Sequence, residues 1–61
     1  MTVSLTDQIA CVRREIGFRK FVYKRRVADG KMSQAKAAAE IAAMEAVLVT
    51  LESMAENERL I

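Results

Sequence analysis

Apolar residues recur at the three- and four-residue spacing of an amphipathic helix in two separate segments of the chain. In the first segment they share one face, broken by the polar Arg19: Leu5, Ile9, Val12, Ile16, Tyr23 and Val27. In the second segment the same spacing is kept by Ala37, Ile41, Met44, Leu48, Leu51 and Ala55. These are the a and d positions through which helices pack in pairs. The pattern predicts two helices that face each other along these apolar stripes.

Gly30 and Ser33 mark the one break between the two segments. Glycine suits the left-handed position just after a helix, and serine suits the cap before the next one. We expect a helix over about 5–28, a turn over 29–33 and a helix over about 34–57. Ser4, with Asp7 three residues on, is the expected cap of the first helix. Because the connection is short, the fold class predicted is all-α: a single domain, residues 1–61, forming an antiparallel helical hairpin.

Each predicted helix carries a second uncharged stripe on another side. On the first helix it consists of Cys11, Phe18 and Val22, with Phe21 to one side. On the second helix it is a stripe of small residues: Ala35, Ala38, Ala39, Ala42, Ala46, Val49 and Ser53. An isolated hairpin leaves both stripes in water, so we expect an oligomer interface. The simplest assembly is a two-fold dimer forming a four-helix bundle or coiled-coil-like oligomer, and higher orders follow if both stripes find neighbours. The alternatives are a partner site for the phenylalanines and helix propensity alone for the alanines.

Composition strengthens the expectation of self-assembly. A chain of 61 residues buries little surface, and small domains of this kind usually need disulfides, a metal or oligomerisation. There is one Cys and no His, so neither an internal disulfide nor a usual zinc motif is available. Cys11 is expected to pack rather than to react. We therefore predict no enzyme activity, catalytic residue, cofactor or metal, and, without a signal peptide or an apolar run long enough for a membrane, a cytoplasmic protein.

Charge is unevenly distributed between the two helices. The first is strongly basic, whereas most of the acidic residues lie in the second. At the expected register, Glu45 and Glu52 lie level with Lys20 and Arg13, which predicts ion pairs between the helices. The basic run of residues 24–26 faces the alanine-rich start of the second helix, where Glu40 is the nearest acid.

The basic side chains of the first helix are therefore candidates for binding an anion or a partner. They are Arg13, Arg14, Arg19, Lys20, Lys24, Arg25 and Arg26. Guanidinium groups match phosphate and carboxylate, so the partner is a nucleic acid, a nucleotide or an acidic protein surface. No DNA-reading motif is present, because the hairpin lacks a third helix. Tyr23 is expected to pack in the apolar stripe, with stacking on a ligand as the alternative.

Several short segments resemble small helical proteins of unassigned activity that are encoded by phages and prophages of proteobacteria. The matching parts are residues 7–9 (DQI), 12–16 (VRREI), 22–23 (VY), 30–34 (GKMSQ) and 40–48 (EIAAMEAVL), with Arg19. In that group a Val-Tyr-Pro-Arg segment is common, and here Lys24 replaces the proline. The resemblance implies a phage-encoded protein in the host cytoplasm. We expect an oligomeric interaction protein that binds a host or phage protein, or alternatively a nucleic acid or nucleotide as a regulator or anti-defence sponge.

Overall fold

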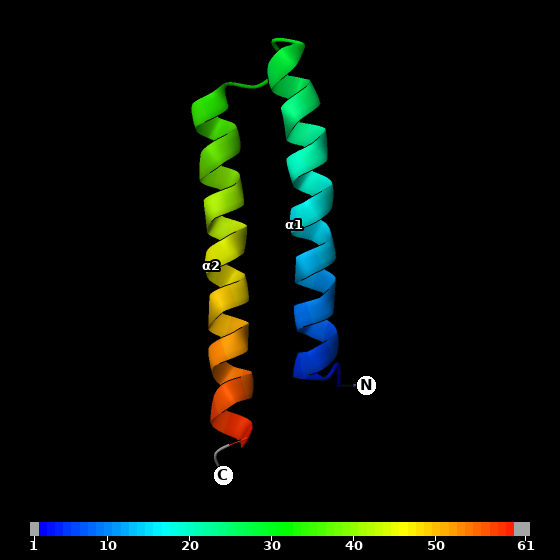
Figure 1. Cartoon of the computed structure of the whole chain (residues 1–61), viewed down its shortest axis with the longest axis vertical. Coiled ribbons are helices and arrows are strands. Elements are labelled where there is room, and N and C mark those ends of the chain that lie inside the picture. Colours follow the sequence, from blue (N-terminus) through cyan, green and yellow to red (C-terminus); the bar gives the residue numbers. More distant parts are fainter. Residues whose placement is uncertain (1, 60–61) are drawn as a thin grey trace.

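Two antiparallel helices make up the fold. The computed structural model describes residues 2–59, in which α1 (Leu5–Ala28) and α2 (Gln34–Arg59) lie side by side. The turn connects them at one end of the molecule, and the two termini lie at the other (Figure 1). The predicted all-α helical hairpin is confirmed, and α2 runs two residues beyond the expected end. Those two residues, Glu58 and Arg59, are good helix formers, and neither glycine nor proline stops the helix before them.

Both helices begin at a serine cap, as expected. The Ser4 hydroxyl accepts a hydrogen bond of 3.1 Å from the backbone N–H of Asp7. The Ser33 hydroxyl does the same for the backbone N–H of Lys36, at 3.0 Å. Each serine satisfies one of the amide groups that the first turn of a helix leaves without a partner. Asp7 also places a negative charge in the first turn of α1, where the helix dipole favours it.

The turn is built on Gly30, whose φ is +71°. The N–H of Lys31 donates to the carbonyl of Arg26 at 2.8 Å, and the N–H of Gly30 donates to that of Val27 at 3.1 Å. This pair of bonds is the Schellman motif, which ends a helix by satisfying its last carbonyls. A residue with a Cβ is strained at this φ, so glycine is required for the local geometry.

The interface between the helices has a single buried side chain. Ile16, in the middle of α1, is 7% exposed, and no other residue between 2 and 58 is classed as buried. The remaining apolar positions of both predicted stripes are half-buried, as two helices alone cover only one side of each stripe. The hairpin covers all the residues predicted for the two apolar stripes, but it covers them only in part.

The hairpin is correspondingly thin and exposed. It measures 48 × 21 × 15 Å, and its radius of gyration is 14.4 Å, where a compact chain of this length has about 10.5 Å. Its accessible surface is 4915 Å², compared with about 3,950 Å² for a typical folded monomer of 6.8 kDa. The excess of about 950 Å² resembles the roughly 800 Å² that each partner buries in a standard protein interface. The accessible surface of the hairpin therefore exceeds that of a compact monomer by about the area that one protein interface buries on each partner.

Candidate functional site

Two of the predicted cations are engaged by carboxylates of α2. Arg13 Nη2 lies 2.6 Å from Glu52 Oε2, and Lys20 Nζ lies 3.9 Å from Glu45 Oε2. These are the pairs expected from the register, so that prediction is confirmed. All four side chains remain largely accessible, and exposed pairs of this kind contribute little stability. They align the helices, and they leave Arg13 and Lys20 less available to an outside anion.

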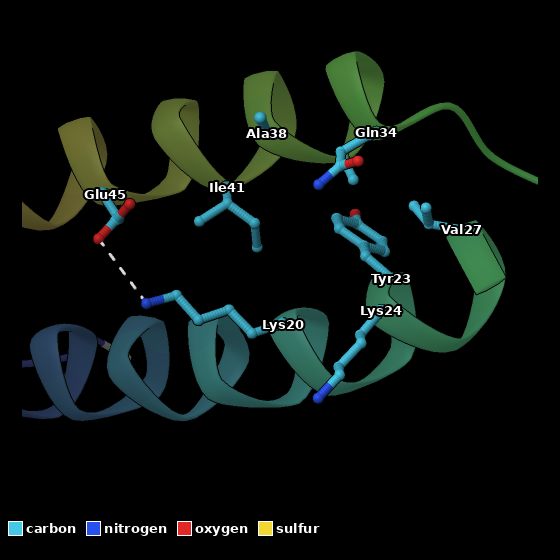
Figure 2. Close-up of a pocket in the computed structure, with 9 residues that line it drawn as sticks. Lys20, Tyr23, Lys24, Val27, Gln34, Ala38, Ile41 and Glu45 are labelled. Atoms are coloured by element: carbon cyan, nitrogen blue, oxygen red, sulfur yellow. Dashed lines mark ion pairs between the residues drawn. The ribbon is translucent and has the colours of Figure 1, made fainter.

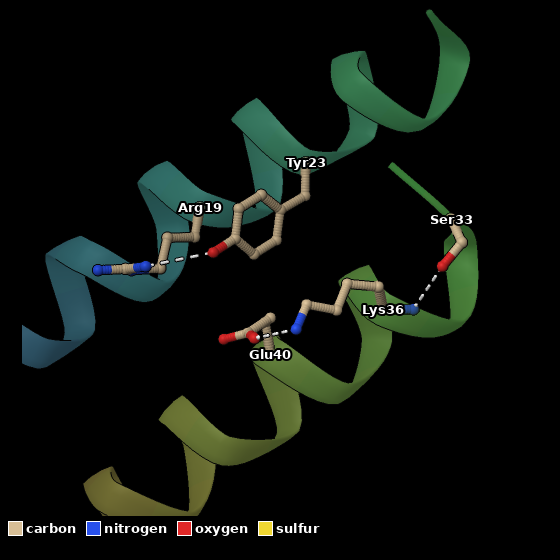
Figure 3. A network of polar contacts seen from close by, with 5 residues as sticks. All are labelled: Arg19, Tyr23, Ser33, Lys36 and Glu40. Atoms are coloured by element: carbon tan, nitrogen blue, oxygen red, sulfur yellow. Dashed lines mark hydrogen bonds and ion pairs between the residues drawn. The ribbon is translucent and has the colours of Figure 1, made fainter. Parts of the chain in front are cut away.

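Arg19 is held within α1. Its Nη1 donates a 3.2 Å hydrogen bond to the Tyr23 hydroxyl, as Figure 3 shows, and its Nε lies 3.6 Å from the Glu15 carboxylate. That Nε is shielded from solvent and makes no hydrogen bond within residues 2–59. The hydrogen bond to the Tyr23 hydroxyl and, to a lesser extent, the carboxylates of Glu15 and Glu40 raise the pKa of Arg19. Arg19 therefore packs along the edge of the apolar stripe.

Four predicted cations have no acidic partner in the described part of the chain. Glu40 pairs with Lys36 of its own helix at 3.2 Å (Figure 3) and forms no ion pair with residues 24–26 at the end of α1. The exposed cationic side chains that take part in no ion pair there are Arg14, Lys24, Arg25 and Arg26, and Lys31 of the turn adds one more. All but Arg14 lie within the last turn and a half of α1 or in the turn itself. We call these four, Lys24, Arg25, Arg26 and Lys31, the basic tip.

The outer side of α1 combines phenylalanines with two of these cations. Phe18 and Phe21 are 64% and 62% exposed, and Arg14 and Arg25 follow the same three- and four-residue spacing. The Arg25 guanidinium carbon lies 5.9 Å from the centre of the Phe21 ring, within the range of a cation–π contact. We call Arg14, Phe18, Phe21 and Arg25 the aromatic face. Of the other residues predicted at an interface, Cys11 is a free, exposed thiol and Val22 is half-buried.

The alanines predicted at an interface, Ala39, Ala42 and Ala46, are all exposed on α2. Three larger apolar side chains of α2 are also at least 47% exposed: Val47, Val49 and Met54. Val49 belongs to the predicted stripe of small residues. Val47 and Met54 fall beside the predicted apolar stripe of α2, where a two-helix fold provides no second layer to cover them.

A groove of about 480 Å³ opens between the helices near the turn. Tyr23, Val27 and Ile41 project into the space between the helices, as Figure 2 shows, and Lys20 reaches across to Glu45. The groove exists because small residues of α2, among them Ala37 and Ala38, oppose the large residues of α1 without filling the space between them. The spacing of apolar residues in the sequence did not predict this opening.

A second hollow, of about 380 Å³, lies toward the C-terminal end of α2. It is lined by Val49, Glu52, Ser53, Glu56 and Asn57, which we call the acidic hollow. This hollow is not among the sites predicted from the sequence. The available signal was the pair of glutamates at positions 52 and 56, one helical turn apart and next to the exposed Val49.

Neither helix is apolar over enough length to span a membrane. Within residues 2–59 no cluster of three or more potential metal-ligating side chains is present. The features that distinguish this hairpin are therefore surfaces: the basic tip, the aromatic face, the acidic hollow and the groove near the turn. In comparisons with known proteins, no family model, no curated protein and no solved structure matches this chain.

Proposed function

We propose that this protein is a small, non-enzymatic interaction protein that assembles as a homo-oligomer and binds an acidic surface of another protein through the basic side of α1. The observation that carries the proposal is the basic tip. Its four cations gather at one end of the molecule around a single carboxylate, that of Asp29, with which none of them forms an ion pair. The carboxylates of α2 nearest to the tip are paired with Lys20 and Lys36. A cluster with this excess of positive charge attracts anionic surfaces and speeds their association.

The physical reason for an oligomer is the excess of exposed surface. A hairpin with one buried side chain has little of its own core to offset the entropy of ordering two long helices. Burying about 800 Å² more per copy supplies the missing apolar contact. A dimer is the simplest such assembly. A phage-encoded protein acting in the host cytoplasm, with a host or phage protein as its target, is consistent with the resemblance described above.

The test compares capture of binding partners by two variants with the same loss of charge. In the first, Lys24→Gln and Arg26→Gln remove two unpaired cations of the basic tip. In the control, Arg13→Gln and Lys20→Gln remove two cations that carboxylates already engage. Partners captured from a bacterial lysate by immobilised protein are then quantified by mass spectrometry. We expect the tip variant to lose specific partners that the control retains, and equal retention by both variants would refute a role of the basic tip.

Binding of a nucleic acid or nucleotide is the second candidate, favoured by the groove near the turn. Its volume of about 480 Å³ is in the usual range of small-molecule sites, and Tyr23 lies there between Lys20 and Lys24. Glu45 on its rim counts against an anion, because its carboxylate would repel a phosphate. Gel retardation of DNA and RNA, and equilibrium dialysis with labelled nucleotides, both at low salt, test this candidate. Binding that weakens steeply with salt would support it, and no binding at low salt would exclude it.

A further inference from the structure

The aromatic face and the acidic hollow are complementary surfaces on different helices. The first presents two exposed aromatic rings beside two cations that have no ion pair within residues 2–59. The second is a shallow hollow between side chains on one face of α2, in which Val49, 61% exposed, is bordered by Glu52 and Glu56. Glu52 already pairs with Arg13, but Glu56 takes part in no ion pair in the described part of the chain.

These two surfaces cannot meet within one molecule. The residues of the aromatic face lie on the side of α1 turned away from Ile16 and the apolar stripe, and they are exposed. The acidic hollow likewise lies on α2 beyond its apolar stripe, and all of its residues are exposed except Glu52, which is half-buried and pairs with Arg13. In the hairpin the two helices lie side by side (Figure 1), and the positions of their apolar stripes are all buried or half-buried. The aromatic face and the acidic hollow can therefore meet only between two copies.

We propose that the aromatic face of one copy docks into the acidic hollow of a second copy, joining the two head to tail. This inference rests on the oligomeric part of the proposed function and names the surfaces that form the contact. The second copy is the occupant because it carries both an exposed apolar side chain for the phenylalanines, Val49, and an unpaired carboxylate for the arginines, Glu56. Burial of aromatic anchors beside charge-assisted pairs is typical of the residues that dominate interfaces.

When α1 of one copy lies antiparallel on α2 of a second copy, the residues of the aromatic face come opposite those of the acidic hollow. With Phe18 seated in the acidic hollow, Arg14 lies one turn toward the N-terminus of α1 and therefore beside Glu56 of the second copy. Phe21, one turn the other way, then lies against Val49 and Ala46 of the second copy. The small side chain at position 46 leaves room for the ring, as in the packing of large residues against small ones in helical bundles.

Contact between two copies of the aromatic face is disfavoured by charge. If two α1 helices meet antiparallel with Phe18 opposite Phe21, then Arg14 of each copy stands opposite Arg25 of the other. A parallel contact sets each arginine against its own counterpart. Like charges facing each other across an interface are strongly unfavourable, so this pattern selects the acidic hollow over a second aromatic face.

A head-to-tail contact has a consequence that a two-fold contact lacks. Each pairing of an aromatic face with an acidic hollow leaves one free surface of each kind at the two ends of the assembly. Such contacts either close into a ring or extend with rising concentration. The mass in solution is therefore expected to exceed that of a dimer as the concentration rises.

The test exchanges charges between the two surfaces. Arg14→Glu sets an acid against Glu56 of the next copy, and Glu56→Arg sets a base against Arg14. We expect each single variant to weaken self-association by roughly 10- to 100-fold. An equimolar mixture of the two variants, or both changes in one chain, brings opposite charges together again and is expected to recover most of the wild-type association. Glu58→Arg, which reverses an exposed glutamate outside the acidic hollow, is the matched control and should associate like the wild type.

Solution mass by light scattering across a concentration series gives the readout, with helicity by circular dichroism alongside. A single variant that cannot assemble can also lose helicity. In that case, the return of helicity when the Arg14→Glu and Glu56→Arg variants are mixed tests the same contact. The inference is overturned if the single variants associate like the wild type, or if mixing them restores nothing. A wild-type chain that stays monomeric at every concentration would also refute the oligomeric part of the proposed function, whereas a wild-type oligomer indifferent to both changes refutes this inference alone.

Discussion

Ile16 is the one side chain that the hairpin buries, so Ile16→Ala should be its most damaging apolar truncation. The change removes three carbons from a site that is 7% exposed. At about 0.8 kcal/mol for each buried CH₂ group, the free energy of unfolding falls by roughly 2 kcal/mol. This is the low end of the range for such truncations, because the open sides of the hairpin let neighbouring side chains close the gap.

That loss is large for a chain of this size. A folded domain of 61 residues has a free energy of unfolding of roughly 3–9 kcal/mol at typical stability per residue. The melting temperature is expected to fall by roughly 8–16 °C. Val47→Ala is the matched control, because it also truncates a branched apolar residue to alanine but at a site that is 47% exposed. Its lost burial is worth about 0.8 kcal/mol, and the higher helix propensity of alanine offsets much of that.

Thermal and urea unfolding of both variants and the wild type, followed by circular dichroism at 222 nm, measures the difference. All three proteins are compared at the same concentration, because assembly also stabilises the folded chain. If Val47→Ala costs as much as Ile16→Ala, the core is not centred on Ile16, and the inside and outside of the hairpin have been assigned wrongly.

Three further predictions concern the turn, an exposed glycine and an ion pair. Gly30→Ala should destabilise the hairpin by about 1–2 kcal/mol in thermal unfolding, because φ at this position is +71°, and an unchanged melting temperature would contradict the Schellman turn. Gly17→Ala should stabilise it by about 0.5–1 kcal/mol, because a Cβ at this helical position meets nothing within 4 Å, so a loss of stability would reveal a close neighbour in the assembly. A double-mutant cycle of Arg13→Ala and Glu52→Ala should give a coupling of about 0.2–1 kcal/mol that shrinks in high salt, and a coupling insensitive to salt would mean that the pair is not exposed to solvent.

The sequence alone determined the features that depend on neighbouring residues. Ser4 and Ser33 cap helices through hydrogen bonds that reach three residues along the chain, and Gly30 ends α1 through bonds within the same turn. The pairing of Arg13 with Glu52 could also be foreseen, since two straight helices joined by a short turn allow one antiparallel register. In each case regular helix geometry converts a spacing in the sequence directly into a position in space.

Tertiary structure decided how much of each surface is covered. The three- and four-residue spacing of apolar residues predicted two apolar stripes. Only the packing of the two helices shows that Ile16 is enclosed, whereas Tyr23 and Ile41 line an open groove. The engagement of Arg19 by Tyr23 and Glu15, and the hollow between Val49 and Glu56, likewise depend on side-chain conformations. A helical repeat specifies the direction in which a side chain leaves the helix. Whether another atom meets it there depends on the distance and rotation between the helices, which spacing along one chain does not contain.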